Sequence, residues 1–274
     1  MFDSESFQKY LSEALAMPEP EEALGALITD AVVSGAEGKV GVLFSGGVDS
    51  TLIAFLLQKA GKPFTCYTTA LVEAESEDLV WARKAASLFG FGHEIVLVNL
   101  AQLEKDLPGI LRIIQRKDPV SAGVAATAYF SLKKAAEDGC TTVFTGLGSE
   151  EIFAGYERHR KAADINAECL AGLSKLFERD IERDQLLCGY FRMKAALPFL
   201  DARVIRKAMA IPGEDKMNPM EKMPLRKAAI SLGLPGEFAM RKKRAAQYGS
   251  RMDWGLERLA KARKQPKSVY LAAL

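Results

Sequence analysis

The chain is poor in cysteine and histidine and has no long apolar run. Its four cysteines and two histidines among 274 residues form neither a Cys-x-x-Cys pair nor a His-x-x-x-His spacing, which disfavours zinc ribbons, dithiol sites and metallohydrolases. No segment approaches the roughly 18 consecutive apolar residues that a membrane span needs. Residues 1–18 lack the basic-then-apolar order of a signal peptide. We therefore expect a cytoplasmic protein without a membrane partner.

The charge is nearly balanced. The chain has 37 Lys and Arg residues against 35 Asp and Glu residues, a net charge of +2 at pH 7. This balance predicts no strong field that would attract a polyanion, so we do not expect a nucleic-acid partner. With 49% hydrophobic residues, the composition is that of an ordinary globular protein large enough to bury a core.

A glycine turn lies between a predicted strand and a predicted helix. Residues 45–50 read Ser-Gly-Gly-Val-Asp-Ser, after the apolar run 40–44 and before the helical pattern 51–57. Two glycines at a helix N-terminus let backbone N–H groups approach an anion closely. Asp49 would repel that anion unless it holds a divalent cation, so the pattern predicts pyrophosphate bound with Mg²⁺. The alternative is an ordinary glycine turn capped by serine and aspartate.

Residues 143–156 form a second segment with glycines after a predicted strand. The strand ends at Thr145, and Glu150 and Glu151 open a helix. Because the carboxyl ends of parallel strands share one edge of a sheet, we expect Glu150 to face Asp49 across one crevice and to complete a Mg²⁺ site. The alternative is that acidic residues simply favour a helix N-terminus.

The order of the predicted elements indicates an α/β fold, with a parallel sheet covered by helices on both faces. Residues 1–37 are predicted to form an N-terminal helical extension, ahead of an α/β domain of residues 38–160. Beyond residue 160 the β pattern fades, and we expect a helical C-terminal part of residues 161–274. The predicted strands are 39–44, 63–69, 93–98 and 141–145, with helices at 49–60, 77–90, 100–115 and 123–138.

Four motifs in a fixed order resemble one enzyme family. The segment 45–50 resembles the PP-loop of N-type ATP pyrophosphatases, which have an adenine nucleotide alpha hydrolase-like fold. The other three are Gly-Leu-Gly-Ser-Glu-Glu-Ile-Phe-Ala-Gly-Tyr at 146–156, Leu-Pro-Phe-Leu-Asp at 197–201 and Arg-Lys-Lys at 241–243. Together the motifs look like the synthetase domain of asparagine synthetase and its relatives, including β-lactam synthetase. The resemblance covers residues 38–250.

The resemblance implies an ATP-dependent ligase that forms AMP and pyrophosphate. In such enzymes a carboxylate attacks the α-phosphate of ATP, and ammonia or an amine then displaces AMP from the acyl-adenylate. It also implies that Asp49 and Glu150 hold Mg²⁺, although the family usually has Asp where Glu150 stands. Lys243 matches a lysine that faces the reacting phosphates, where its charge stabilises the transition state. The residues expected to bind ATP and pyrophosphate are Ser45, Gly46, Gly47, Asp49, Ser50 and Gly146.

Two departures from the family leave the substrates open. The family carries Gly-x-Glu-x-Arg before its Pro-Phe-Leu-Asp, whereas Lys194 and Ala196 stand at the Glu and Arg positions here. A lysine cannot do the proton chemistry of a carboxylate, so Lys194 is either a catalytic-site residue that binds an acidic substrate or part of a solvated helix face. Residues 1–37 are too few for the family's glutaminase domain. We therefore expect nitrogen from free ammonia, an amine or a separate glutaminase partner.

Two other functions fit parts of the same pattern. A PP-loop enzyme that adenylates a tRNA base or another nucleobase would bind RNA, and the near-neutral charge and unpaired cysteines count against it. A nucleotide-binding subunit that has lost catalysis would bind ATP and Mg²⁺ without turning ATP over. A homodimer is compatible with each of these functions. Of the basic residues Arg241, Lys242 and Arg244, we expect at least two to lie on a solvated face or a polyanion-binding patch.

Overall fold

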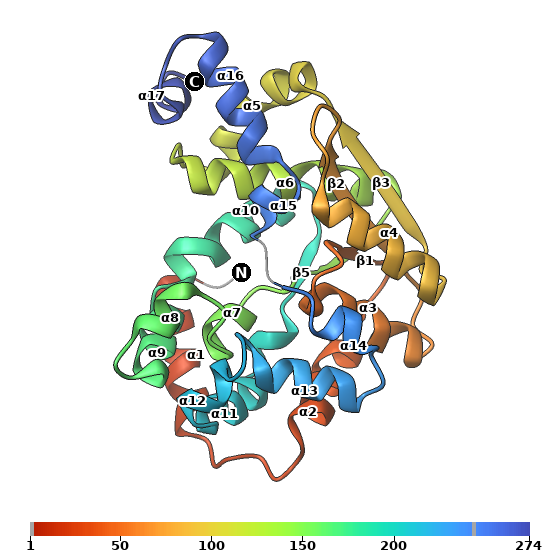
Figure 1. Cartoon of the computed structure of the whole chain (residues 1–274), viewed down its shortest axis with the longest axis vertical. Coiled ribbons are helices and arrows are strands. Elements are labelled where there is room, and N and C mark those ends of the chain that lie inside the picture. The colour runs from red at the N-terminus through yellow and green to blue at the C-terminus, as the bar shows by residue number, and fades with distance from the viewer. Residues whose placement is uncertain (1–2, 243–244) are drawn as a thin grey trace.

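The centre of the molecule is a parallel β-sheet. The computed structural model describes residues 3–242 and 245–274 (Figure 1). Within these ranges five strands lie in the order β3-β2-β1-β4-β5, and every neighbouring pair is parallel. Because β1 pairs with both β2 and β4, the strand order reverses beside β1, and ligands bind at such switch points in parallel sheets. The strands are β1 (Val40–Leu43), β2 (Phe64–Leu71), β3 (His93–Val98), β4 (Thr142–Phe144) and β5 (Lys194–Ala196).

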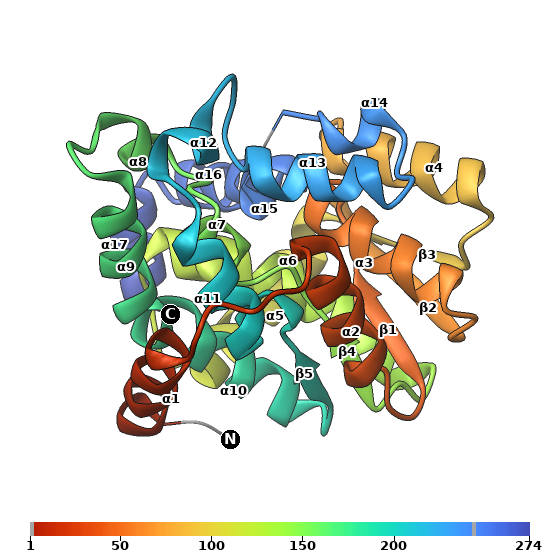
Figure 2. The same cartoon turned by 90° about the horizontal axis from the view of Figure 1, so that it is seen from below.

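Helices cover both faces of the sheet, as Figures 1 and 2 show. Each face carries its own apolar core, because the central strands β1, β2 and β4 are largely buried on both sides and present apolar residues to each layer. On one face pack α2 (Leu24–Gly35), α3 (Val48–Lys59), α4 (Glu77–Phe89), α11 (Ala202–Ala210), α13 (Met223–Ser231) and α14 (Gly236–Ala239). On the other pack α5 (Leu100–Ile114), α6 (Pro119–Glu137), α10 (Glu182–Tyr190), α16 (Met252–Ala262) and α17 (Lys267–Ala272).

The remaining elements complete the chain. They are α1 (Ser4–Ala16), α7 (Ser149–Ile152), α8 (Glu157–Lys161), α9 (Ile165–Ser174), the π-helical turn η1 (Phe177–Ile181), the 3₁₀ turn η2 (Pro198–Leu200), α12 (Gly213–Met217) and α15 (Ala246–Gly249). α1 packs on α11, so the N-terminal helix joins the same layer as a helix from the C-terminal part of the chain. In the described part of the chain, no helix is both long and apolar enough to cross a membrane.

The predicted α/β fold with helices on both faces is confirmed. The four predicted strands are present, and the helix expected at 123–138 begins earlier, because Asp118 caps it and Pro119 occupies its first turn. β5 lies in the part that was expected to be helical. Its sequence Lys-Ala-Ala has no β-branched residue, and it becomes a strand by pairing with Thr142–Phe144 of β4. The proposed boundaries 1–37, 38–160 and 161–274 stay a prediction.

Candidate active site

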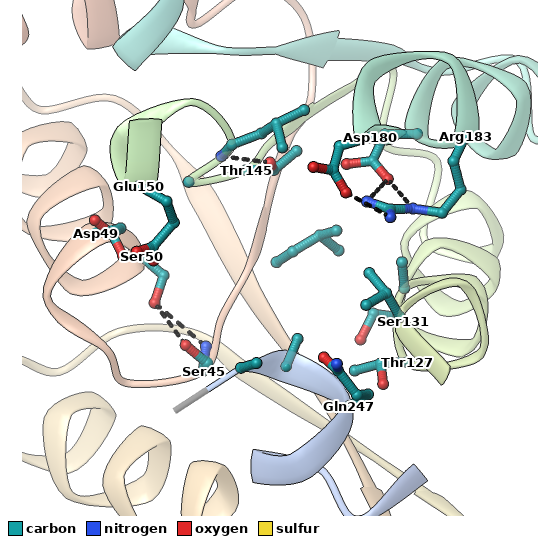
Figure 3. A pocket seen from close by; sticks show the side chains of 18 of the residues that line it. Ser45, Asp49, Ser50, Thr127, Ser131, Thr145, Glu150, Asp180, Arg183 and Gln247 are labelled. Carbon is teal, nitrogen blue, oxygen red and sulfur yellow. Dashed lines mark hydrogen bonds and ion pairs between the residues drawn. The ribbon is translucent and has the colours of Figure 1, made fainter. Parts of the chain in front are cut away.

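A cavity of about 640 Å³, the main cavity, opens at the carboxyl ends of the strands. Its floor comes from the ends of β1 and β2 and from the segment after β4, and its walls come from α6, α10 and α15. Figure 3 shows three groups of side chains around it. Asp49 and Glu150 lie together at one side, Asp180 and Arg183 at a second, and the polar residues of α6 and α15 at a third.

The first group contains the loop of residues 45–50, here called the phosphate loop. Gly46 has a φ of +69°, and a Cβ there would lie 2.5 Å from the carbonyl carbon of Trp81, so only glycine fits. Gly47 donates its N–H to Ser45 Oγ at 3.2 Å and precedes α3. No side chain among the described residues caps α3. Its first N–H groups therefore point toward the loop with the positive end of the helix dipole, as an anion site requires.

The second predicted segment lies directly against this loop, because β1 and β4 are neighbours in the sheet. A Cβ on Gly146 would come within 2.8 Å of Asp49 Cβ, so glycine allows the two segments to touch. Thr145 Oγ1 accepts a hydrogen bond from the N–H of Leu147 at 3.0 Å and fixes the turn. The structure thus brings Asp49, Gly146 and Glu150 to one place.

Lys222 lies between the carboxylates of Asp49 and Glu150. This position was not predicted from the sequence. Lys222 Nζ lies 2.8 Å from Asp49 Oδ2, 2.5 Å from Glu150 Oε1 and 3.0 Å from Ser149 Oγ. The side chain is buried. Burial by itself would lower the pKa of Lys222, but the charges of Asp49 and Glu150 outweigh it and raise that pKa. A lysine just before a helix is a weak sequence signal, so only its position between two acids reveals it.

The pair Asp49 and Glu150 also fits Mg²⁺. Among the described residues, no cluster of three or more His, Cys, Asp or Glu side chains could hold a metal ion alone. Mg²⁺ bound with a nucleotide uses one or two carboxylates and takes its other ligands from phosphates and water. Two carboxylates share one ammonium here, so negative charge remains for a cation beside the phosphate loop.

Arg241 supports the phosphate loop from behind. It is buried, and it donates to the Ser45 carbonyl oxygen at 2.7 Å and to Asp78 Oδ1 at 2.8 Å. Arg241 therefore does not lie on a solvated face, because its guanidinium pairs with Asp78 inside the protein. The expectation that at least two of Arg241, Lys242 and Arg244 lie on such a face or patch stays a prediction. Lys242 is exposed. The expectations for Lys243 and Arg244 lie outside the described residues.

Lys194 does not reach this site. It is the first residue of β5 and lies opposite Thr142, the first residue of β4. Both residues are therefore at the amino end of the sheet, whereas the main cavity is at the carboxyl end. The Lys194 side chain is 67% exposed and its Nζ lies 2.9 Å from Glu37 Oε2. The structure thus corrects the expected catalytic position and gives Lys194 a surface ion pair instead.

The second group is a network of charges on η1 and α10, not anticipated from the sequence. Asp180 pairs with Arg179 Nε at 2.6 Å and with Arg183 Nη1 at 2.8 Å. Arg179 also pairs with Glu151 of α7. Burial raises the pKa of Glu151 to about 7, although Arg179 opposes the shift. Positively charged arginines and negatively charged carboxylates therefore line this end of the main cavity.

The third group forms a wall with apolar and hydroxyl side chains. Val124 and Ala128 lie one helical turn apart on α6, so they share a face that lines the main cavity. Thr127 and Ser131 line it too. Ser131 Oγ lies 2.7 Å from Thr69 Oγ1 of β2, which ties the wall to the floor. Such a wall, apolar with a few fixed polar groups, suits the ring of a nucleoside.

Known proteins resemble this chain over most of its length. A Methanocaldococcus jannaschii protein provisionally named asparagine synthetase (glutamine-hydrolyzing) 1 is 29% identical over 290 residues, covering 90% of this chain and 53% of that protein. The asparagine synthetase (glutamine-hydrolyzing) of Rattus norvegicus is 29% identical over 224 residues, covering 77% of this chain and 40% of that protein. The chain thus spans about half the length of these curated relatives, or less.

Solved structures and a family model were also compared. The U34-tRNA thiolase NcsA from Methanococcus maripaludis superposes with a TM-score of 0.42 at 18% identity, covering 98% of this chain and 77% of that one. The model of the family described as asparagine synthase matches residues 23–171 and 160–268. These two matches take in the phosphate loop, Glu150 and Lys222. The chain therefore belongs to the asparagine synthase family.

Proposed function

We propose that the protein is an ATP-dependent ligase that forms AMP and pyrophosphate and joins a carboxylic acid to ammonia or an amine. The observation that carries the proposal is the cluster of Asp49, Lys222 and Glu150 beside the open N-terminus of α3. Opposite charges held at a phosphate-binding loop suit a reaction in which negative charge moves from one phosphate to another.

The first step takes place at the phosphate loop. A carboxylate oxygen of the acid attacks the α-phosphorus, the bond from that phosphorus to the bridging oxygen breaks, and pyrophosphate leaves with the electron pair. Asp49 and Glu150 would hold Mg²⁺, which supplies positive charge to the phosphates when bound. Lys222 stabilises the charge that develops on the same oxygens. The α3 N-terminus binds the terminal phosphates.

The second step takes place in the rest of the main cavity. The amine nitrogen attacks the acyl carbon, the bond to the AMP oxygen breaks, AMP leaves with the electron pair, and the nitrogen loses a proton to water. The nucleoside lies against the α6 wall, and the acid extends toward the charges of η1 and α10. Arg179 and Asp180 lie at that end, so they are placed to select the acid by its charged groups.

The test is an analysis of nucleotide products. Purified protein is incubated with ATP, Mg²⁺, ammonium and either aspartate or a pool of other carboxylic acids, and AMP, ADP and pyrophosphate are measured. We expect AMP and pyrophosphate in equal amounts with at least one acid. Asp49→Asn should abolish them, whereas Asp215→Asn, an exposed carboxylate on α12, should not.

Each other result has a definite meaning. Formation of ADP in place of AMP would contradict the proposal. ATP binding without any product, with every acid and amine tried, would favour the nucleotide-binding subunit that has lost catalysis. Product formation that requires tRNA would favour the nucleobase-modifying enzyme.

A further inference from the structure

Charged side chains of alternating sign form a row along one end of the main cavity, here called the charged end. Figure 3 shows two of them, Asp180 and Arg183, on the side of the cavity away from Asp49 and Glu150. The ion pairs of the row run through α8, α7, η1 and α10 without a break. In order, they join Arg158, Glu151, Arg179, Asp180, Arg183 and Asp184. Three arginines and three carboxylates therefore balance one another in the row.

A further carboxylate makes the charged end negative. Glu168 of α9 pairs with Arg158 at 3.0 Å, although Arg158 already faces Glu151. The other arginine that lines the main cavity, Arg116, pairs with Glu182 of α10 and so balances only that acid. With every group ionised, these ion pairs contain one more carboxylate than arginine.

Asp118 adds a second negative charge without a cation. It lines the main cavity two residues after Arg116, whose Nη1 donates to the Arg179 carbonyl oxygen at 3.1 Å. The Asp118 carboxylate accepts the N–H of Ser121 at 2.9 Å and caps α6. In residues 3–242 and 245–274 it takes part in no ion pair. The charged end thus has two carboxylates more than it has arginines.

Two carboxylate oxygens of the row are left without a donor. Arg183 contacts Asp184 at Oδ1, at 2.8 Å, and this contact leaves Oδ2 for a ligand. Asp184 lines the main cavity, and its side chain is 16% exposed. Burial raises the pKa of Asp184 although the charge of Arg183 opposes the shift, so a second positive charge beside this carboxylate would be favourable. Glu151 Oε2 is buried and accepts no hydrogen bond from the described residues.

This balance of charge favours one kind of ligand group over another. A positive group at the charged end would donate hydrogen bonds to a carboxylate that lacks a full set of partners. A second carboxylate would meet an excess of negative charge, and each arginine that could receive it is already paired. The charged end therefore suits a cation and rejects an anion.

We propose that the acid of the reaction carries a positively charged amino or guanidino group at the end away from its reacting carboxylate, and that it has no second carboxylate. This inference rests on the proposed function, in which the acid extends from the phosphate loop toward η1 and α10. Its positive group donates to Asp184 Oδ2 while its carboxylate reaches the α-phosphorus. Asp184 is then a specificity-determining residue, and Asp118 adds attraction at longer range.

The first test compares acids of similar length that differ in charge at the far end. Calorimetric titrations use the full chain, Mg²⁺ and an ATP analogue with a methylene group between the α- and β-phosphorus, so that no reaction occurs. The probes are 4-aminobutyrate, pentanoate and glutarate, and the longer set 6-aminohexanoate, heptanoate and pimelate. We expect the amino acid of at least one set to bind at least tenfold more tightly than its two counterparts. Equal binding within both sets, no binding of either amino acid, or tighter binding of a dicarboxylate would overturn the proposal.

The second test removes one negative charge at a time. Asp184→Asn and Asp118→Asn each keep an oxygen acceptor, and asparagine caps a helix as well as aspartate does. We expect Asp184→Asn to weaken the preferred amino acid at least tenfold and Asp118→Asn to weaken it by a smaller factor. Binding of the uncharged acid of the same length should stay within twofold in both. The matched control Asp215→Asn, at an exposed position outside the main cavity, should leave both affinities within twofold.

The ratio between the charged and the uncharged acid distinguishes recognition from a structural role. An equal loss for both acids in Asp184→Asn would show that Asp184 only supports the fold, against the proposal. If Asp184→Asn does not fold, the same ratio is measured in Asp118→Asn, whose cap is preserved, and an unchanged ratio there would overturn the proposal.

These results also separate the inference from the proposed function. If the amino acid binds preferentially but no acid gives AMP, the cation-binding end of the cavity stands and the ligase does not. If AMP forms faster with aspartate or glutarate than with either amino acid of the two sets, the ligase stands and the inference is wrong.

Discussion

Lys222 and Asp49 lie 173 residues apart in the sequence, and in the fold their charged groups meet at 2.8 Å. The contact joins the loop before α13 to the N-terminus of α3, so one ion pair connects the C-terminal part of the chain to the phosphate loop. Glu150 completes the cluster from the segment after β4. The proposed chemistry therefore depends on three segments that only the tertiary structure assembles.

Removal of the ammonium should affect both stability and activity. Lys222→Met leaves Asp49 and Glu150 without the cation between them, and loss of one partner from a buried ion cluster costs about 3–5 kcal/mol. We expect a matching loss in the free energy of unfolding, measured with urea, and no AMP formation. Mg²⁺ should raise the melting temperature of the variant more than that of the wild type, because it can take the place of the ammonium between the carboxylates. An equal rise in both proteins would argue against a shared cation site.

Two glycines have the same backbone conformation but different surroundings, so alanine variants at them distinguish the effect of backbone strain from that of a steric clash. Gly46 and Gly61 have φ values of +69° and +66°, but only at Gly46 would a Cβ meet the backbone of Trp81, at 2.5 Å. Each change to alanine should cost about 1 kcal/mol for the left-handed conformation. We expect Gly46→Ala alone to lose ATP binding by more than tenfold in a calorimetric titration. Retained binding would mean that the phosphate loop tolerates a displacement of α4.

Lys194 should be dispensable for turnover. Its ion pair with Glu37 is exposed, and such pairs contribute about 0–1 kcal/mol. Lys194→Ala should therefore keep kcat and KM for the acid within about twofold of the wild type. Steady-state measurement of AMP formation tests this, and a large rise in KM for the acid would restore the sequence-based hypothesis of a role in substrate binding.

Lys216 should make stability depend on pH in the alkaline range. Burial lowers its pKa from 10.5 to about 8, and no carboxylate pairs with it in the described residues. Between these two values the unfolded chain binds more protons than the folded one, so stability rises with pH across that window and is lowest below it. The full effect is about 3 kcal/mol.

The matched variant for this effect is Lys216→Met, which keeps an unbranched side chain beside Met209. Its free energy of unfolding should exceed that of the wild type most at pH 7, and the difference should shrink toward pH 10.5. Lys227→Met, at an exposed position, should show no such trend in urea denaturation at several pH values. A difference that is constant with pH would show that Lys216 is not titrating in this range.

Local patterns were enough to predict the fold. The buried strand β1 is a short apolar run, β2 is rich in β-branched and aromatic residues, and the helix between them repeats apolar residues at helical spacing. β5 escaped prediction because its strand conformation comes from pairing with β4 and not from its own residues. The phosphate loop was predicted for the opposite reason, since the motif that marks it consists of particular residues within six consecutive positions.

By itself the sequence determined the α/β fold, the phosphate loop and the acidic residues Asp49 and Glu150, because each depends on residues close together in the chain. The tertiary structure alone decided which cationic side chains lie beside that loop. It brought Lys222 and Arg241 to it and left Lys194 at the opposite end of the strands. The physical reason is that a charged group interacts strongly only over a few ångströms. Strand order and packing set the distances between side chains in the fold, and the separation of two residues along the sequence does not reveal these distances.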